Sequence, residues 1–301
     1  MQAIQFDQFG GPDVLHLADI DVPQPGPGQV RVQVKAAGVN PLDGKIRSGA
    51  MGKMMPTSFP AVPGFELAGV VDALGDGAGD VKVGDEVVGW ADTGAYAEYA
   101  LATTVAIKPA GLSFVDAVAL PIAGATAQRV LDSLEVSEGE TVLIHGATGA
   151  VGTVAVQLAV ARGARVVGTA GTANQDYLTS LGATATVYGE GLVERVRAFA
   201  PKGIDAVFDV AGKGALPESI VLRGGTDRIV TIADFRADEL GVTFSASPRE
   251  RSVAVLAAQA ELAASGRLLT TVKTYPLDQA AAAQQDSDSG HSRGKIVLTV
   301  A

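Results

Sequence analysis

The stretch VLIHGATGAVGTVAVQLA, Val142 to Ala159, decides the fold. A β-branched run gives way to a turn rich in glycine and alanine, and a long apolar, helix-like stretch follows. A strand that ends in a tight turn and opens a helix lets backbone N–H groups approach an anionic ligand, because no side chains intervene. We therefore expect this turn to hold a phosphate group.

The glycines of the turn are Gly146, Gly149 and Gly152, which form a variant of the GxGxxG pattern. The context strengthens the pattern, because TVLIH precedes it, a helical stretch follows, and the strand-like run RVVGT comes next. Gly149 then lets a diphosphate approach the backbone, and Gly152 lets the helix pack closely on the strand. The alternative is a plain strand-to-helix turn without a ligand.

The pattern of the sequence changes near residue 120. Before it, short β-like runs broken by glycine and proline predict a compact β-rich domain. After it, strand-like runs alternate with helical ones, and RSVAVLAAQAELAAS at residues 251–265 closes the series. This alternation predicts an α/β fold with a doubly wound parallel sheet. The last 35 or so residues return to β-like runs, and we expect them to rejoin the first domain.

Composition excludes several classes of protein. The 301 residues are 47% hydrophobic and 19% charged, as in an ordinary globular protein, and the net charge of −10 argues against a nucleic-acid partner. The chain has no cysteine and three scattered histidines, so we expect no metal site. We expect no signal peptide, because the start lacks a basic end and an apolar run, and no apolar stretch of about 20 residues that could span a membrane. A cytoplasmic protein without a membrane partner is the expectation.

The segment after the second strand indicates which dinucleotide binds. An NAD site usually carries an acidic residue about 20 residues beyond the glycine pattern, on the ribose 2′-hydroxyl. Here GTAGTAN, Gly168 to Asn174, has no carboxylate, and the first one is Asp176. A 2′-phosphate would meet no repulsion and could bond to Thr172, Asn174 or backbone N–H groups. We therefore expect NADPH rather than NADH.

Several motifs together resemble the medium-chain dehydrogenase/reductase superfamily, and more closely its zinc-independent quinone oxidoreductase branch, the zeta-crystallin-like proteins. They are AAGVNPLDGKIRSG, PGFELAGVV, GDEVVG, AYAEYA, GATGAVG and GKIVL, in the family's order over nearly the whole chain. The resemblance implies a GroES-like β-barrel domain over residues 1–121 and 266–301. It also implies a Rossmann dinucleotide-binding domain over residues 122–265.

The resemblance also implies site residues. The family's zinc branch has a cysteine and a histidine ligand where this chain has Asn40 and Phe65, and Glu66 alone cannot hold zinc. Asn40 is expected to orient a substrate carbonyl, and Asp43 to support the loop or the ribose. The expected cofactor-binding residues are Thr126, Gly146, Ala147, Thr148, Gly149, Ala150, Val151, Gly152, Thr169, Gly171, Thr172, Asn174, Tyr188, Val210, Ala211, Ile232, Ala233 and Lys295.

Structural alternatives remain open for several of these residues. Asn40 could simply cap the loop before Pro41, and Asp43 could be structural. Tyr188 could be an ordinary edge-strand aromatic residue, and His145, at the end of a buried strand, is expected to be a core histidine rather than an acid. The methionines Met51, Met54 and Met55 could cover an apolar pocket or belong to a loop without a role.

The resemblance implies hydride transfer from NADPH to a quinone. The alternatives are reduction of an α,β-unsaturated ketone, an enone, and an NADPH-binding protein without turnover. GVTFSAS, residues 241–247, is expected to form an edge strand that pairs with its twin in a homodimer.

Overall fold

The computed structural model describes residues 1–246 and 251–301, and its internal contacts divide the chain into two compact units. The first unit comprises Met1–Ile122 and Arg251–Ala301, and the second comprises Ala123–Glu250. The C-terminal segment of the chain therefore belongs to the first unit. Each unit is described below by itself.

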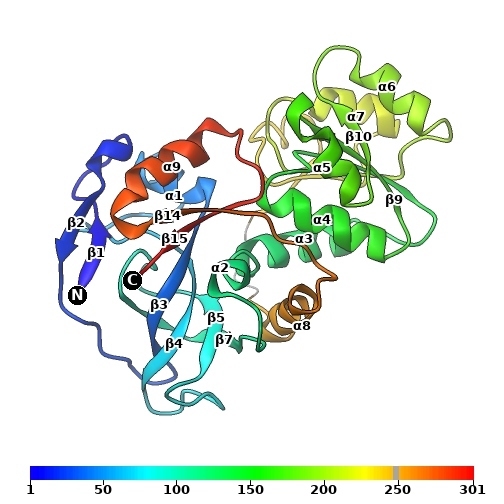
Figure 1. The fold of residues 1–301 in the computed structure, drawn as a ribbon. Helices are drawn as coiled ribbons and strands as arrows, with labels where there is room; N and C mark the ends of the chain where they lie inside the picture. Colours follow the sequence, from blue (N-terminus) through cyan, green and yellow to red (C-terminus); the bar gives the residue numbers. More distant parts are fainter. Residues whose placement is uncertain (247–250) are drawn as a thin grey trace. The chain divides into compact units, whose positions relative to one another are not determined.

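A mostly antiparallel sheet forms the frame of the first unit. Its strand order is β14-β15-β3-β4-β5-β7, with β6 also paired to β3, and β1 and β2 form a separate pair. In Figure 1, β3, β4 and β5 run beside one another in blue to cyan. The strands are β1 Gln2–Gln5, β2 His16–Asp19, β3 Val30–Val39, β4 Glu66–Leu74, β5 Glu86–Trp90, β6 Tyr99–Ala102, β7 Thr104–Ile107, β14 Val272–Pro276 and β15 Lys295–Thr299.

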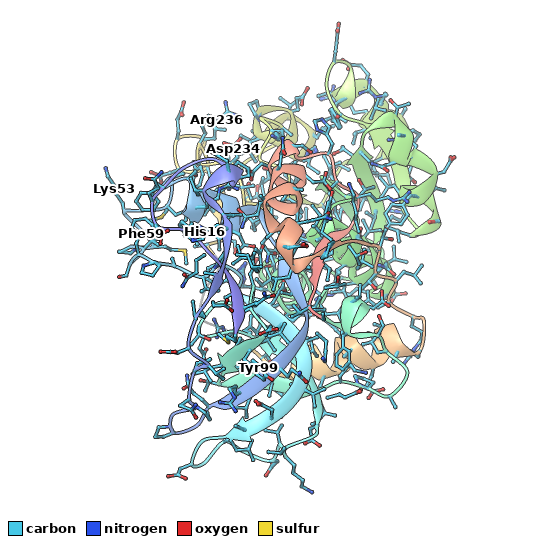
Figure 2. All side chains as sticks on the ribbon, turned by 60° about the vertical axis from the view of Figure 1, so that its left-hand side comes forward. His16, Lys53, Phe59, Tyr99, Asp234 and Arg236 are labelled. Atoms are coloured by element: carbon cyan, nitrogen blue, oxygen red, sulfur yellow. The ribbon has the colours of Figure 1, made fainter. Side chains whose placement is uncertain are left out.

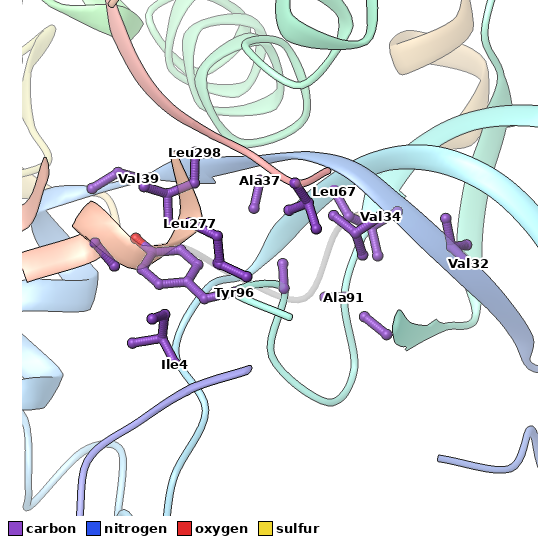
Figure 3. Packing of buried hydrophobic residues seen from close by; sticks show 14 of the residues in the cluster. Ile4, Val32, Val34, Ala37, Val39, Leu67, Ala91, Tyr96, Leu277 and Leu298 are labelled. Carbon is purple, nitrogen blue, oxygen red and sulfur yellow. The ribbon is translucent and has the colours of Figure 1, made fainter. Parts of the chain in front are cut away.

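The sequence of β3 explains why this strand is central. Its first half, VRVQVK, alternates buried valines with half-buried polar residues, as in a strand with one face on the core. Its second half, AAGV, is buried throughout, because β15 and β4 flank it on either side. The core cluster includes Val32, Val34 and Leu298, together with the ring of Tyr96 (Figure 3).

Four helices of the first unit lie at the edges of this sheet or beside it. They are α1 Pro41–Arg47, α2 Phe114–Ala117, α8 Val253–Ala264 and α9 Ala280–Ser289. The buried guanidinium of Arg47 joins α1 to α9, because it donates to Gln284 Oε1 at 2.7 Å and to Asp288 Oδ2 at 2.7 Å. Helix α3, Pro121–Ser133, begins at the end of the first unit and continues into the second.

The second unit has the predicted doubly wound parallel sheet. Its strand order is β10-β9-β8-β11-β12-β13, and every pairing is parallel. This is the order of a Rossmann fold, in which the first strand lies at the centre. The strands are β8 Thr141–His145, β9 Arg165–Ala170, β10 Thr184–Val187, β11 Ala206–Asp209, β12 Ile229–Thr231 and β13 Thr243–Phe244. The helices are α4 Ala150–Ala161, α5 Gln175–Ser180, α6 Leu192–Phe199 and α7 Leu216–Arg223.

The structure differs from the sequence expectations in two places. The helix expected to close the Rossmann domain, α8, packs against β7 and α2 and belongs to the first unit, so the second unit ends about 15 residues earlier than expected. The expectation that no stretch could span a membrane is wrong on length and composition, because Phe114–Ser133 passes that test. However, 61% of its apolar window is buried inside the protein, and a core helix passes the same test.

Candidate functional site

The glycine-rich turn lies between β8 and α4, at the carboxyl end of the central strand. Gly146 has φ +70°, a conformation that favours glycine, and a Cβ on Gly152 would overlap the Gly146 carbonyl oxygen. A Cβ on Gly149 would meet only that oxygen, at 3.6 Å, so Gly149 leaves open space at the helix N-terminus. Gly152 therefore allows the close packing, and Gly149 leaves room for a ligand. This geometry fits a diphosphate.

The expected ribose-side residues follow the next strands. Tyr188 comes directly after β10 and is 57% exposed, and its hydroxyl lies 3.7 Å from where a Cβ on Gly171 would stand. The structure thus brings Gly171 and Tyr188 together. Gln175, the residue after Asn174, donates from Nε2 to the carbonyl oxygens of Ala170 at 2.9 Å, Gly171 at 3.2 Å and Thr186 at 3.2 Å. Gln175 therefore ties β9 to β10.

Arg195 of α6 supports the Tyr188 loop from its other side. Its guanidinium donates to the carbonyl oxygens of Glu190 at 2.7 Å and Val187 at 2.9 Å, and to Thr186 Oγ1 at 3.2 Å. The sequence reasoning missed this residue. The signal that could have indicated it is a basic side chain on the helix that follows the loop.

The carboxyl ends of β11 and β12 are joined by a buried carboxylate. Asp209 Oδ1 accepts from the backbone N–H groups of Ala211 at 3.0 Å and Gly212 at 3.1 Å, and Oδ2 accepts from Thr231 Oγ1 at 2.8 Å. Thr231 Oγ1 in turn accepts from the N–H groups of Ala233 at 3.1 Å and Asp234 at 3.0 Å.

This carboxylate and hydroxyl shape the two segments that hold the predicted cofactor contacts Val210, Ala211, Ile232 and Ala233. Beyond them, Asp234 pairs with Arg236 at 3.0 Å (Figure 2), and this pairing lowers the pKa of the Asp234 carboxyl. Asp209 and Thr231 were not predicted from the sequence.

His145 is a core histidine, as expected. It is 1% exposed, with Nε2 2.9 Å from Ser219 Oγ and Nδ1 3.3 Å from Thr169 Oγ1. Burial lowers the pKa of the imidazole to about 4, against the opposing effect of the Asp209 charge. Neutral at physiological pH, it acts in packing.

In the first unit, the predicted residues Asn40 and Asp43 lie at the start of α1. Asn40 occupies the N-cap position, and its backbone N–H donates to Asp43 Oδ2 at 2.8 Å, so Asp43 supports the loop. Tyr96, which was not predicted, donates to the same oxygen at 2.8 Å. Within residues 1–246 and 251–301, no donor reaches Asp43 Oδ1. Burial raises the pKa of this carboxyl to about 7, although both hydrogen bonds and the Lys295 charge oppose the shift.

A cavity of about 550 Å³ lies next to Asp43 in the first unit. Its walls are largely apolar and include Phe6, Ile46, Met55 and Phe65. Of the three methionines considered as cover residues, Met55 therefore lines a cavity, whereas Met54 is 64% exposed. Phe59, labelled in Figure 2, packs edge-on against Phe6 at 5.7 Å and so supports the cavity wall.

Lys295, expected to contact the cofactor, lies in the first unit in contact with Asn40 and Glu66. Its Nζ donates to Asn40 Oδ1 at 2.6 Å and pairs with Glu66 Oε1, and the side chain is 2% exposed. Asn40 Nδ2 donates to the same Glu66 oxygen at 2.9 Å. The structure thus brings Lys295 into contact with Asn40 and Glu66, a contact that was not predicted from the sequence.

Two family comparisons match most of the chain. Residues 26–111 match the alcohol dehydrogenase GroES-like domain, and residues 150–264 match the zinc-binding dehydrogenase family. The second name raises the question of whether the residues present fit zinc. Across the described ranges, no three His, Cys, Asp or Glu side chains gather as metal ligands. At the expected ligand positions, the Lys295 ammonium already contacts the oxygens of Asn40 and Glu66. This donor set does not fit zinc.

Relatives identify the branch. The quinone oxidoreductase of Homo sapiens is 34% identical to this chain, over 99% of the chain and 97% of its own length. The solved quinone oxidoreductase of Coxiella burnetii is 32% identical with a TM-score of 0.89, covering 100% of this chain and 99% of its own. The Escherichia coli quinone oxidoreductase complexed with NADPH is 29% identical with a TM-score of 0.88, covering 99% and 100%. The chain belongs to the quinone oxidoreductase family of the medium-chain dehydrogenase/reductase superfamily.

Proposed function

We propose that this protein is an NADPH-dependent oxidoreductase that transfers a hydride to a quinone without zinc. The observation that carries the proposal is the open turn from Gly146 to Gly152 on a Rossmann sheet, in a chain that matches quinone oxidoreductases over 99% of its length. One of the solved relatives is complexed with NADPH. When bound, NADPH supplies the hydride, which is the difficult chemical step.

The residues of the second unit would bind and orient the cofactor. The N–H groups at the start of α4 would bind the diphosphate, and the helix dipole would favour its negative charge. On the ribose side, Gly171 and Tyr188 border a segment, Gly168 to Asn174, that contains no carboxylate to repel a 2′-phosphate. These features support NADPH over NADH.

The residues of the first unit would act on the acceptor. Asn40 holds a side-chain N–H that can donate to the oxygen on which negative charge develops. A quinone needs little more help, because its ring delocalises that charge. The largely apolar cavity beside Asp43 would take a flat, apolar acceptor.

Two relatives favour a second candidate, the reduction of an alkene conjugated to a ketone. The 2-methylene-furan-3-one reductase of Solanum lycopersicum and the alkenal/one oxidoreductase of Arabidopsis thaliana are each 35% identical. They cover 77% and 75% of this chain, and 62% and 61% of their own lengths. In that reaction the hydride adds at the β-carbon of the acceptor, and a proton from water completes the saturated ketone.

One assay separates these functions. The loss of NADPH absorbance is followed with a panel of quinones and enones, and the products are analysed. Hydroquinone supports the main proposal, and a saturated ketone supports the second candidate. Tight NADPH binding without oxidation of any acceptor contradicts both and identifies a binding protein. A Michaelis constant for NADH equal to or below that for NADPH contradicts the cofactor assignment.

We also propose a homodimer. Strand β13 is the last strand of the parallel sheet, its two residues are exposed, and Phe244 stacks on the exposed Phe235 at 5.6 Å. Ser247, the end of the expected edge segment, lies outside the described residues. An exposed strand edge next to apolar rings favours pairing with a second copy. Light scattering that gives the monomer mass contradicts this proposal. A cytoplasmic location without membrane association stays a prediction from the sequence.

A further inference from the structure

Three buried polar side chains meet in the first unit at the ends of three neighbouring strands. Asn40 follows β3, Glu66 begins β4 and Lys295 begins β15, and they are 7%, 0% and 2% exposed. The pairing of Ile296 with Val39 and of Leu67 with Ala37 brings these ends together. A Cβ on Gly38 would overlap the Glu66 side chain, so this glycine provides the space for the carboxylate.

The contacts among them close a triangle. Lys295 Nζ donates to Asn40 Oδ1 at 2.6 Å, Asn40 Nδ2 donates to Glu66 Oε1 at 2.9 Å, and Lys295 and Glu66 form an ion pair. Turning the amide by 180° would place its NH₂ group against the ammonium and its oxygen against the carboxylate. Both contacts would be repulsive, so the two charges permit one orientation of the amide.

This orientation leaves one side-chain N–H of Asn40 for another partner. A primary amide has two N–H donors, and Glu66 takes one of them. The ammonium on the amide oxygen draws electron density from the nitrogen, which strengthens the remaining N–H as a donor. A donor with a fixed direction stabilises developing negative charge better than one that must reorient.

We infer that Lys295 and Glu66 are positioning residues that hold the Asn40 amide with its second N–H directed at the acceptor oxygen. The inference rests on the proposed function and replaces the expected role of Lys295 as a cofactor ligand. Burial of the ammonium and its two contacts within the triangle support this assignment. The same ammonium pairs with the Glu66 carboxylate. A metal ion would need this carboxylate as a ligand.

The test uses the double variant Glu66→Gln/Lys295→Met in the full chain. Removing both charges avoids a buried, unpaired carboxylate, which is strongly destabilising. The matched control is Glu86→Gln/Lys108→Met, which removes another ion pair of a buried lysine in the same sheet, at 2.9 Å and away from Asn40. Fluorescence of Trp90 and circular dichroism establish that each variant is folded.

Loss of one fixed oxyanion donor lowers kcat by a factor of about 10² to 10³, and loss of its orientation is expected to cost about tenfold or more. We expect kcat to fall by about tenfold or more in Glu66→Gln/Lys295→Met, while the NADPH dissociation constant changes less than about twofold. In an Asn40→Ala background the same double change is expected to have no further effect on kcat, because its target is gone. The control variant is expected to keep the wild-type kcat.

Two results of the kinetic and binding measurements would overturn the inference. One is a rise of about tenfold in the NADPH dissociation constant with an unchanged kcat, which is the behaviour of a cofactor ligand. The other is a triple variant in which the effects of Asn40→Ala and of the double change on kcat multiply, because this shows that the charged pair and Asn40 act independently.

The orientation of the Asn40 amide can also be measured in the absence of turnover. A failure of this inference can therefore be distinguished from a failure of the proposed function. In wild-type protein, one side-chain N–H of Asn40 should exchange slowly with solvent in NMR spectra. Both should exchange rapidly in the double variant, and equal exchange in the two proteins contradicts the inference.

Discussion

Replacing Asp43 with asparagine should flatten the pH dependence of the stability of the first unit. Burial raises the pKa of the Asp43 carboxyl from 3.8 to about 7 in the folded state. Between these values the folded protein binds a proton that the unfolded chain releases. The stabilisation is therefore fully present below about pH 4 and is lost as the pH rises towards 7. At 1.36 kcal/mol for each pH unit, the difference of about three units corresponds to about 4 kcal/mol.

Asparagine is a close mimic of the protonated acid. Its amide oxygen can accept from the Asn40 N–H and the Tyr96 hydroxyl, as Oδ2 does, and its NH₂ group takes the place of Oδ1. The variant carries no charge at any pH, so its stability should lack the decline between pH 4 and 7. Wild-type protein should therefore lose about 4 kcal/mol relative to the variant over this range.

The measurement is urea unfolding at several pH values, followed by fluorescence. Trp90 is the one tryptophan of the chain and is 5% exposed in β5, so its signal reports the first unit. Asp80→Asn, a change at an exposed loop residue, serves as the control and should run parallel to wild type. If the curves of wild type and Asp43→Asn also run parallel from pH 4 to 8, the argument from burial is refuted.

Three further changes test the second unit. Gly152→Ala places a Cβ on the Gly146 carbonyl oxygen, so the turn must shift, and NADPH titration should show a dissociation constant raised about tenfold or more. Asp209→Ala removes the acceptor of two loop amides, which should cost about 2–5 kcal/mol in chemical unfolding and weaken NADPH binding; an unchanged affinity would refute the loop-shaping role. Arg228→Gln breaks the pairing that holds the Glu140 pKa at about 2, a stabilisation present above about pH 4.5 and lost as the pH falls towards 2. Thermal unfolding at pH 7 should therefore show a loss of about 1–3 kcal/mol that becomes smaller as the pH falls towards 2.

The Rossmann sheet was predictable because its signals are local. The run TVLIH is β8, and the helical stretch expected after the glycine-rich turn is α4 at Ala150–Ala161. The alternation of strands and helices then requires parallel pairing, which the structure has. Helix α7 escaped prediction because its LPESIVLR sequence between two short strands is too brief for a clear periodic pattern.

The misplaced helix and the unpredicted residues have a different cause. The apolar pattern of α8 predicts a helix, but its neighbours β7 and α2 lie more than 100 residues away in the sequence. Likewise, Lys295 and Asn40 are 255 positions apart, and only the pairing of β15 with β3 reveals their contact. Periodicity reports which face of an element is apolar and carries no information about which distant element covers it.

The two buried carboxylates of the first unit, Asp43 and Glu66, have different sets of partners. Glu66 is fully buried but has the Lys295 ammonium, the Asn40 amide and the Ile122 N–H, at 2.9 Å, around its oxygens. Asp43 is also buried, but its hydrogen bonds all fall on Oδ2, and the pKa of its carboxyl rises to about 7. Burial thus raises the pKa of a carboxyl with which no cation makes direct contact. Lys295 pairs directly with Glu66, and among residues 1–246 and 251–301 no ion pair forms with Asp43, so no cation in direct contact offsets the burial of the Asp43 carboxyl.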